Sequence, residues 1–262
     1  MTTNFLHPTS EEYVQHHLEY LQLDLHTFTL GKGGFWTLNL DTLALTIIFG
    51  ALFFAIFRFT VIRFNKGCPG KLQNFIEMTI EFIQQSVADV FHGNSSLVAP
   101  LALTVFVWVF SLSALDLIPV DLQHLFGFEH FRSVPTDDPN FTFALSISVF
   151  LLIIVYNFKA KGFKGFTKEM LTAPFGIWLF PFNVVFRLIE EIVKPISLSL
   201  RLFGNIFAGE LIFLLIATMP WWIQWTAGGI WSIFHVLIIA IQAFVFMMLT
   251  IIYLSMAHDS QH

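Results

Sequence analysis

Long apolar runs separated by short polar segments dominate the hydrophobic pattern of this chain. Four runs, at residues 42–62, 97–120, 141–158 and 230–256, carry one charged residue or none. A helix rises about 1.5 Å per residue, so each run can cross a bilayer core of about 30 Å. A fifth run, residues 173–219, is broken by prolines and charges, so we expect a tilted helix there. The pattern predicts an all-α membrane protein with about five membrane helices, including a long, steeply tilted helical hairpin.

Residues 72–92 follow a helical period instead of forming an apolar run. The apolar stripe consists of Leu72, Phe75, Ile76, Thr79, Ile83, Val87 and Val90, and the polar stripe of Glu77, Glu81, Gln84, Gln85 and Asp89. A segment with this pattern is too polar to span a membrane. We therefore predict one in-plane amphipathic helix that lies in the interface or packs beneath the bundle.

The N-terminal segment differs from the rest of the chain, which we treat as one polytopic membrane domain over residues 41–262. Residues 1–40 are acidic and have no basic stretch followed by an apolar run, so they do not resemble a signal peptide. His16 and His17 could bind a metal, but no further metal-ligand pattern accompanies them, which favours a surface role. We expect an external N-terminal segment without a metal site.

The basic residues predict the orientation in the membrane. Of 13 Lys and Arg residues, eight follow the first and third apolar runs: Arg58, Arg63, Lys66, Lys71, Lys159, Lys161, Lys164 and Lys168. Residues 121–140, between the second and third runs, are acidic instead. Because cytoplasmic loops carry the excess of Lys and Arg, we expect the N-terminus outside and the C-terminus in the cytoplasm.

Composition agrees with a membrane setting and excludes some partners. Hydrophobic residues make up 56% of the chain and charged residues 12%, against a usual charged fraction of about 25%. A single cysteine, Cys68, excludes an internal disulfide. The formal net charge of -5 gives no indication of a nucleic-acid partner.

Two charged residues lie inside the fifth apolar run, where charge is costly. Arg201 and Glu210 both fall in its apolar second half. A charge at the centre of a bilayer costs about 3 kcal/mol on insertion scales, so such residues usually face a partner or a water-filled path. A buried ion pair that only orders the bundle is the alternative, but small-residue packing orders membrane helices at lower cost.

Helix geometry separates these two charges. At about 100° per residue, positions 190, 194, 197, 201, 205 and 208 share one face, which is polar and rich in small residues. Glu210 lies about 180° around the helix from Arg201 and about 13 Å further along it. The two residues therefore do not pair with each other in a straight helix.

Titratable side chains are expected on both sides of Arg201. Glu210 lies towards the outside, where it could meet His235 and Asp116 from other runs, although Asp116 could also be an interfacial carboxylate near a helix end. Glu190 lies roughly 16 Å towards the inside. Carboxylates and histidine exchange protons, whereas the arginine guanidinium stays charged. The arrangement predicts two proton-accessible paths separated by a permanent cation.

Three other classes of protein could also account for charged residues inside a membrane helix. A proton-coupled secondary transporter also needs buried carboxylates and an arginine, but the chain has no internal repeat of the kind common in transporters. An intramembrane enzyme is disfavoured because the chain lacks a metalloprotease motif or a second acidic partner for Asp116. A scaffold leaves Arg201 and Glu210 without a purpose.

Residues 200–210 make the chain similar to a known family. Their sequence, LRLFGNIFAGE, with His235 and Gln242 on the last run, closely resembles the a subunits of bacterial F-type ATP synthases. The resemblance extends over nearly the full length, through His16-His17-Leu18, Pro69-Gly70-Lys71, Ala99-Pro100-Leu101, residues 116–119 (DLIP) and residues 165–169 (GFTKE).

The resemblance implies a role for each candidate residue. Arg201 would face a rotor ring of c subunits and block a direct proton leak, and Glu210, His235 and Asp116 would line the outer half-channel. Asn205 and Gln242 would be polar neighbours of the arginine. For the inner half-channel the candidates are Glu190 and Glu191. At position 187 this chain departs from the family pattern, because it has Arg187 where related chains carry an acidic residue nearby.

The resemblance also implies partners and a location. We expect a proton-translocating stator subunit that contacts the c-ring, the b-subunit peripheral stalk, other ATP synthase subunits and lipid, in a bacterial inner membrane. The chain has no phosphate-binding glycine loop, so ATP chemistry is expected on other subunits and no cofactor or metal is expected here. The chain alone is not expected to be an enzyme.

Overall fold

The predicted apolar runs form helices in the computed structural model. The structure describes residues 22–24, 37–65, 67, 69–91, 97–117, 134–172 and 177–259. For some residues of the last two ranges, it describes the backbone but not the side chain. His16 and His17 lie outside the described residues, as does most of the acidic 121–140 segment. The helices are α2 (Leu40–Ile62), α3 (Lys71–Val90), α4 (Val98–Ser113), α6 (Pro139–Thr172), α7 (Phe180–Ala217) and α8 (Trp221–Asp259). Three short 3₁₀ helices accompany them: η1 (Ala114–Leu117), η2 (Pro135–Asp137) and η3 (Ile177–Leu179).

Within this described part, five helical segments are long and apolar enough to cross a membrane. They are Leu40–Ile62, Val98–Leu117, Pro139–Lys159, Phe180–Ala217 and Trp221–Met256. The fold class predicted from the sequence, an all-α membrane protein with about five spanning helices, is therefore confirmed.

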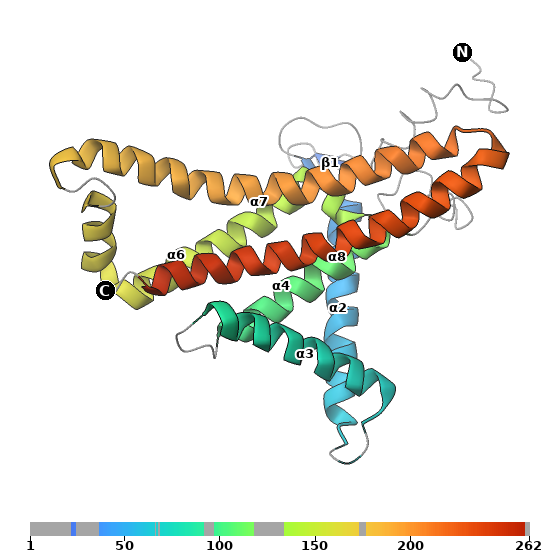
Figure 1. Cartoon of the computed structure of the whole chain (residues 1–262), viewed down its shortest axis with the longest axis horizontal. Coiled ribbons are helices and arrows are strands. Elements are labelled where there is room, and N and C mark those ends of the chain that lie inside the picture. The colour runs from blue at the N-terminus through green and yellow to red at the C-terminus, as the bar shows by residue number, and fades with distance from the viewer. Residues whose placement is uncertain are drawn as a thin grey trace.

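Helices α7 and α8 form the long hairpin. They lie close together near the turn that joins them, diverge towards the start of α7 and the end of α8, and cross the direction of α2 at a steep angle (Figure 1). The turn between them is short, because the carbonyl of Pro220 already accepts the N–H groups of Ile223 and Gln224, at 3.0 and 3.1 Å. Helix α8 therefore begins at Trp221, ahead of the predicted start at residue 230.

A glycine ends the membrane-spanning part of α6. Gly162 has a positive φ of 69°, and the helical segments on either side of it meet there at a kink. A side chain rarely adopts this backbone conformation, so glycine is suited to the position. The kink separates the apolar span Pro139–Lys159 from the lysine-rich residues that follow.

Helix α3 is amphipathic, but its buried stripe is rotated from the predicted one. Ile76, Ile83 and Val87 are buried as expected, whereas Phe75 is exposed and Gln73 is buried. The Gln73 amide explains the difference, because it donates to the carbonyl of Asn65 at 3.1 Å and accepts from the same residue's N–H at 3.2 Å. A polar side chain is buried there because it completes the turn that leads into α3.

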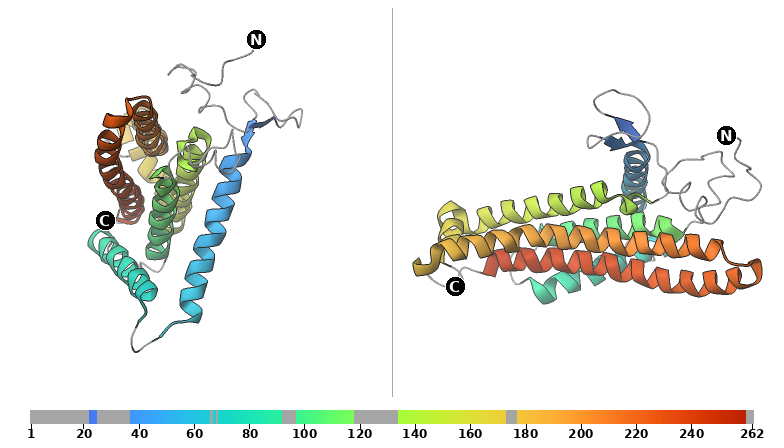
Figure 2. Two further views of the ribbon diagram at one scale, coloured as in Figure 1. Left: turned by 90° about the vertical axis from the view of Figure 1, so that its right-hand side faces the viewer. Right: turned by 90° about the horizontal axis from the view of Figure 1, so that it is seen from above.

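Helix α2 stands at the edge of the structure. Helices α4 and α6 lie between it and the α7–α8 hairpin (Figure 2), and only 6% of its most apolar stretch is buried. The ring of Trp108 on α4 packs close against Gly50 of α2. At the other point of attachment, Asp138 accepts hydrogen bonds from the side chains of Asn39 and Thr42. These contacts lie near the start and the middle of α2, and much of the helix is left open to lipid or to another chain.

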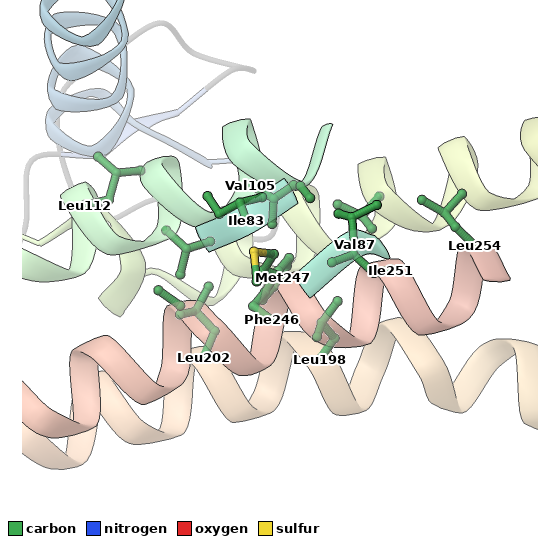
Figure 3. Packing of buried hydrophobic residues seen from close by; sticks show 14 of the residues in the cluster. Ile83, Val87, Val105, Leu112, Leu198, Leu202, Phe246, Met247, Ile251 and Leu254 are labelled. Atoms are coloured by element: carbon green, nitrogen blue, oxygen red, sulfur yellow. The ribbon is translucent and has the colours of Figure 1, made fainter. Parts of the chain in front are cut away.

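The core lies between α4, α6, α7 and α8, and Ile83 and Val87 of α3 pack into it (Figure 3). Phe246 and Met247 of α8 are completely buried among side chains from the other helices, such as Leu202 of α7. Hydroxyl groups also join α6 to α7: Ser199 donates to Thr142 at 3.2 Å. Because membrane helices gain little from hydrophobic contact alone, such polar and close-packed contacts fix their positions.

A short antiparallel sheet precedes α2. Strand β1 (Gln22–Asp24) pairs with β2 (Thr37–Asn39), with Gln22 opposite Asn39. The hydrophobic pattern does not predict this pairing, because three residues are too few to show an alternation. The sheet is minor and leaves the fold class unchanged.

Candidate functional site

Arg201 lies on the outer surface of α7. Its side chain is exposed, and among the described residues no hydrogen bond or ion pair to it is found. The alternative of an internal ion pair with Glu210 does not hold, because Glu210 is 8% exposed and Arg201 is exposed, on a different side of the helix. The separation of the two charges predicted from helix geometry is therefore confirmed.

The face around Arg201 is small, polar and open. Ser197, Asn205 and Ala208 are exposed on it, one or two helical turns from Arg201. A methyl group added at Gly204 would meet nothing within 4 Å. This small-residue face, formed by residues 197, 201, 204, 205 and 208, is therefore uncovered in the described structure and permits close approach of another helix.

Asn205 and Gln242 connect this face to α8. The Asn205 Nδ2 group donates a hydrogen bond of 2.7 Å to Oε1 of Gln242. Gln242 is only 3% exposed, and its own amide nitrogen has no hydrogen-bond partner in the described part of the chain. The pair thus lies one turn from Arg201 and leaves one buried donor directed at a position without a protein acceptor.

Asp116 and His235 form a buried pair two turns of α8 before Gln242, on nearly the same face of that helix. The carboxylate of Asp116, in η1, is hydrogen-bonded to Nε2 of His235. His235 is fully buried and Asp116 nearly so. The imidazole packs between Phe213, at 5.4 Å between ring centroids, and Trp231, at 6.0 Å. Two aromatic rings and one carboxylate therefore fix the orientation of the histidine, a group that can carry a proton.

Gly209 allows α7 to approach His235 closely. A methyl group at Gly209 would overlap the His235 ring, with 2.7 Å to Nδ1 and 3.0 Å to Nε2. Glu210 is the next residue and is buried at the same level of α7. The structure therefore brings α7, α8 and η1 together where the sequence predicted that Glu210, His235 and Asp116 could meet.

Glu190 belongs to a separate cluster of four charges on α7. Arg187 lies 3.4 Å from Glu190 and 3.2 Å from Glu191, and Lys194 lies 3.1 and 3.0 Å from the same two carboxylates. The cluster consists of i,i+3 and i,i+4 pairs and has no net charge. Glu190 is thus apart from the Asp116–His235 pair, as expected for a residue of a second path.

Sequence reasoning missed Gly209, which no charge or motif distinguishes from other small residues. It also missed Asn157 of α6, which is buried with an unpaired carbonyl oxygen among the described residues. A polar residue in the apolar 141–158 run is the signal that could have indicated it. In the described ranges, no group of three or more His, Cys, Asp or Glu side chains is suited to hold a metal ion.

These features define a class: a multi-pass helical membrane protein with an uncovered arginine on one helix and a buried carboxylate–histidine pair behind it. Comparison with known sequences gives the family. Residues 43–255 match the family described as ATP synthase A chain, and the chain belongs to that family.

The similarity to curated relatives extends over almost the whole length of this chain. The chain is 59% identical over 256 residues to ATP synthase subunit a of Coxiella burnetii (strain RSA 493 / Nine Mile phase I), covering 96% of this chain and 97% of the relative. It is 51% identical over 257 residues to the Alkalilimnicola ehrlichii protein of the same name, covering 97% and 98%. ATP synthase subunit a 2 of Hahella chejuensis is 49% identical over 269 residues, covering 96% and 98%. The resemblance to a subunits of bacterial F-type ATP synthases is therefore confirmed.

Proposed function

We propose that this chain is the stator subunit that carries protons through the membrane sector of an F-type ATP synthase, against a rotating ring of c subunits. The main support is Arg201, a permanent cation that is exposed on an uncovered face of small residues. An arginine at membrane depth needs an anionic or polar partner. A carboxylate carried past it on a c subunit meets that need, and the small side chains let the ring approach.

Two half-channels end at this face. The outer one uses the Asp116–His235 pair and the neighbouring Glu210, all buried between α7, α8 and η1. Asn205 and Gln242, which hydrogen-bond to each other beside the arginine, line the last part of this path before the ring. The inner one begins near Glu190, on the far side of Arg201 along α7. Between Lys194 and Glu210, α7 carries no charged or titratable residue except Arg201, so a proton crosses only on the ring.

In the proposed mechanism, proton transfer to and from the ring carboxylates is coupled to rotation of the ring. A proton from the outer path neutralises a ring carboxylate, and the neutral site can then move into lipid, where an ionised one would be costly. After rotation the site meets the inner path and releases its proton. Arg201 holds the ionised carboxylate until the next step. Each proton supplies about 2.3 kcal/mol per 100 mV of membrane potential.

Orientation and further partners complete the proposal. The N-terminus lies outside and the C-terminus in the cytoplasm of a bacterial inner membrane, since the basic segments follow α2 and the α6 span. Helix α2 is largely uncovered, which suits contact with the b-subunit peripheral stalk. ATP is made by other subunits.

The test replaces Arg201 by alanine in the intact complex. In reconstituted vesicles, Arg201→Ala should abolish proton-driven ATP synthesis while the complex still purifies with all its subunits. Arg63→Ala is the matched control, because Arg63 at the end of α2 stacks on Phe59 at 4.2 Å and lies outside both paths. Normal synthesis by Arg201→Ala would reject the proposal. Purification as a lone chain that couples solute uptake to protons would favour a secondary transporter instead.

A further inference from the structure

A small cleft opens between α6, α7 and α8 beside the charged cluster on α7. Its polar lining comes from all three helices: Asn157 of α6, Arg187, Glu191 and Lys194 of α7, and Tyr253 of α8. Apolar side chains of α6 and α8 form the rest of its wall. The cleft has a volume of about 20 Å³. A site that holds one water molecule needs at least about 10–15 Å³, so the cleft admits water but not a lipid headgroup.

Asn157 indicates what the cleft contains. The residue is 6% exposed, and its carbonyl oxygen Oδ1 has no hydrogen-bond partner among the described residues. A buried acceptor without a donor is unfavourable, and such groups in folded proteins usually bind ordered water. A water molecule in the cleft would supply the missing donor.

The charges of the cluster exclude an anion and distinguish the two glutamates. Arg187 and Lys194 are both paired with Glu190 and Glu191 at 3.0–3.4 Å, so the four charges cancel. The side chain of Glu191 is 19% exposed and lines the cleft, whereas that of Glu190 is 46% exposed and does not line it. Glu191 is therefore the carboxylate in contact with the cleft.

Lys194 joins the cleft to the small-residue face. It lies seven residues before Arg201, two helical turns away on the same side of α7, and its ammonium group is 5.6 Å from the centre of the Tyr253 ring. The cleft thus opens next to the face that carries Arg201. Water there would be about 10 Å along the helix axis from the arginine.

We infer that this cleft is a water-filled exit of the inner half-channel, with Glu191 as its proton-exchanging group. The inference rests on the proposed function. The proton released by a ring carboxylate passes through water to the Glu191 carboxylate and from there to the cytoplasm. Arg187 and Lys194 position Glu191, and Asn157 and Tyr253 hold the water.

The presence of water can be tested without measuring activity. The only cysteine, Cys68, is first replaced by serine in the whole complex. Asn157→Cys is then compared with Val155→Cys, whose position on α6 is 62% exposed and faces away from the cleft. Silver ions are small enough to follow water and react with thiolates. The measured quantity is the rate at which Ag⁺ blocks the new thiol, read as loss of later maleimide labelling. We expect this rate to be at least tenfold higher for Asn157→Cys than for Val155→Cys. Equal rates would overturn the inference.

The assignment of Glu191 is tested by ATP-driven proton pumping in proteoliposomes. Glu191→Gln should slow pumping at least tenfold and more than Glu190→Gln does, and Glu191→Asp should restore part of the rate. An equal or larger loss with Glu190→Gln would overturn the assignment, as would a normal rate with Glu191→Gln. Arg201→Ala, measured in parallel, separates the two proposals: if it stays coupled, the proposed function itself fails.

Discussion

Replacing Gly209 by alanine probes how closely α7 approaches His235. The new methyl group would lie 2.7 Å from Nδ1 and 3.0 Å from Nε2 of the imidazole, and closer still to Cε1. Carbon atoms in contact prefer about 3.5–4.0 Å, so the ring or the helix must retreat by roughly 1.5 Å. The ring has little room to do so, because Phe213 and Trp231 pack against it and Asp116 holds its Nε2.

The expected cost follows from these contacts. Overpacking a close-packed site costs about 1–3 kcal/mol, and loss of a buried hydrogen bond to a charged group costs about as much again. Alanine recovers up to about 1 kcal/mol because it is a better helix former than glycine. The net destabilisation should be about 2–4 kcal/mol, and displacement of His235 from Asp116 should slow proton entry by at least tenfold.

The assay measures thermal unfolding of the purified complex and ATP-driven pumping in proteoliposomes. Gly228→Ala is the control, because its methyl group would meet only Ile216, at an ordinary 3.7 Å. That variant should keep or slightly raise the melting temperature and keep the pumping rate. A double variant, Gly209→Ala with His235→Ala, should lose less stability than the sum of the two single losses, because the methyl group no longer meets the ring, and should not recover pumping. If Gly209→Ala alone matched the wild type in both measurements, the close packing of α7 on His235 would be refuted.

Three further predictions concern other contacts. The hydrogen bond between Asn205 and Gln242 predicts that Asn205→Ala and Gln242→Ala are non-additive by about 1 kcal/mol in a double-mutant cycle of thermal stability; additive losses would exclude their coupling. Asp138→Ala removes an acceptor that ties α2 to the residue between η2 and α6 and should lower stability by about 1–3 kcal/mol, with loosening seen as faster proteolysis near α2. Gly50→Val places a larger side chain against Trp108 of α4, where even a Cβ would lie 2.8 Å from the ring, and should cost about 1–3 kcal/mol. An unchanged melting temperature would show that α2 can move away freely.

Periodicity predicted the helices well because lipid leaves a helix few alternatives. Backbone groups must be hydrogen-bonded within the segment, so a long apolar run becomes a spanning helix. The same argument does not locate helix ends. The start of α8 at Trp221 depends on the Pro220 carbonyl closing the turn, and the rotated buried stripe of α3 depends on Gln73 completing a turn with Asn65.

Some features of the candidate site were also predictable from the sequence, and others were found only in the structure. The sequence predicted that Arg201 and Glu210 point in different directions, because the angle between two positions on one helix depends only on their spacing. It predicted that Glu210 could meet Asp116 and His235, but not that the aspartate and the histidine are hydrogen-bonded to each other. It gave no indication of Gly209, whose importance arises only from the ring packed against it.

By itself, the sequence determined the spanning helices, the charge asymmetry of the loops, the directions of the charged side chains on α7 and the family. These follow from local spacing, from the cost of charge in lipid and from a distinctive motif. Only the tertiary structure decided which helices touch, that Glu191 and not Glu190 lines the cleft with Asn157, and that the Arg201 face stays uncovered. Helix packing in lipid depends on close contacts and single hydrogen bonds between distant residues, and no local pattern records these.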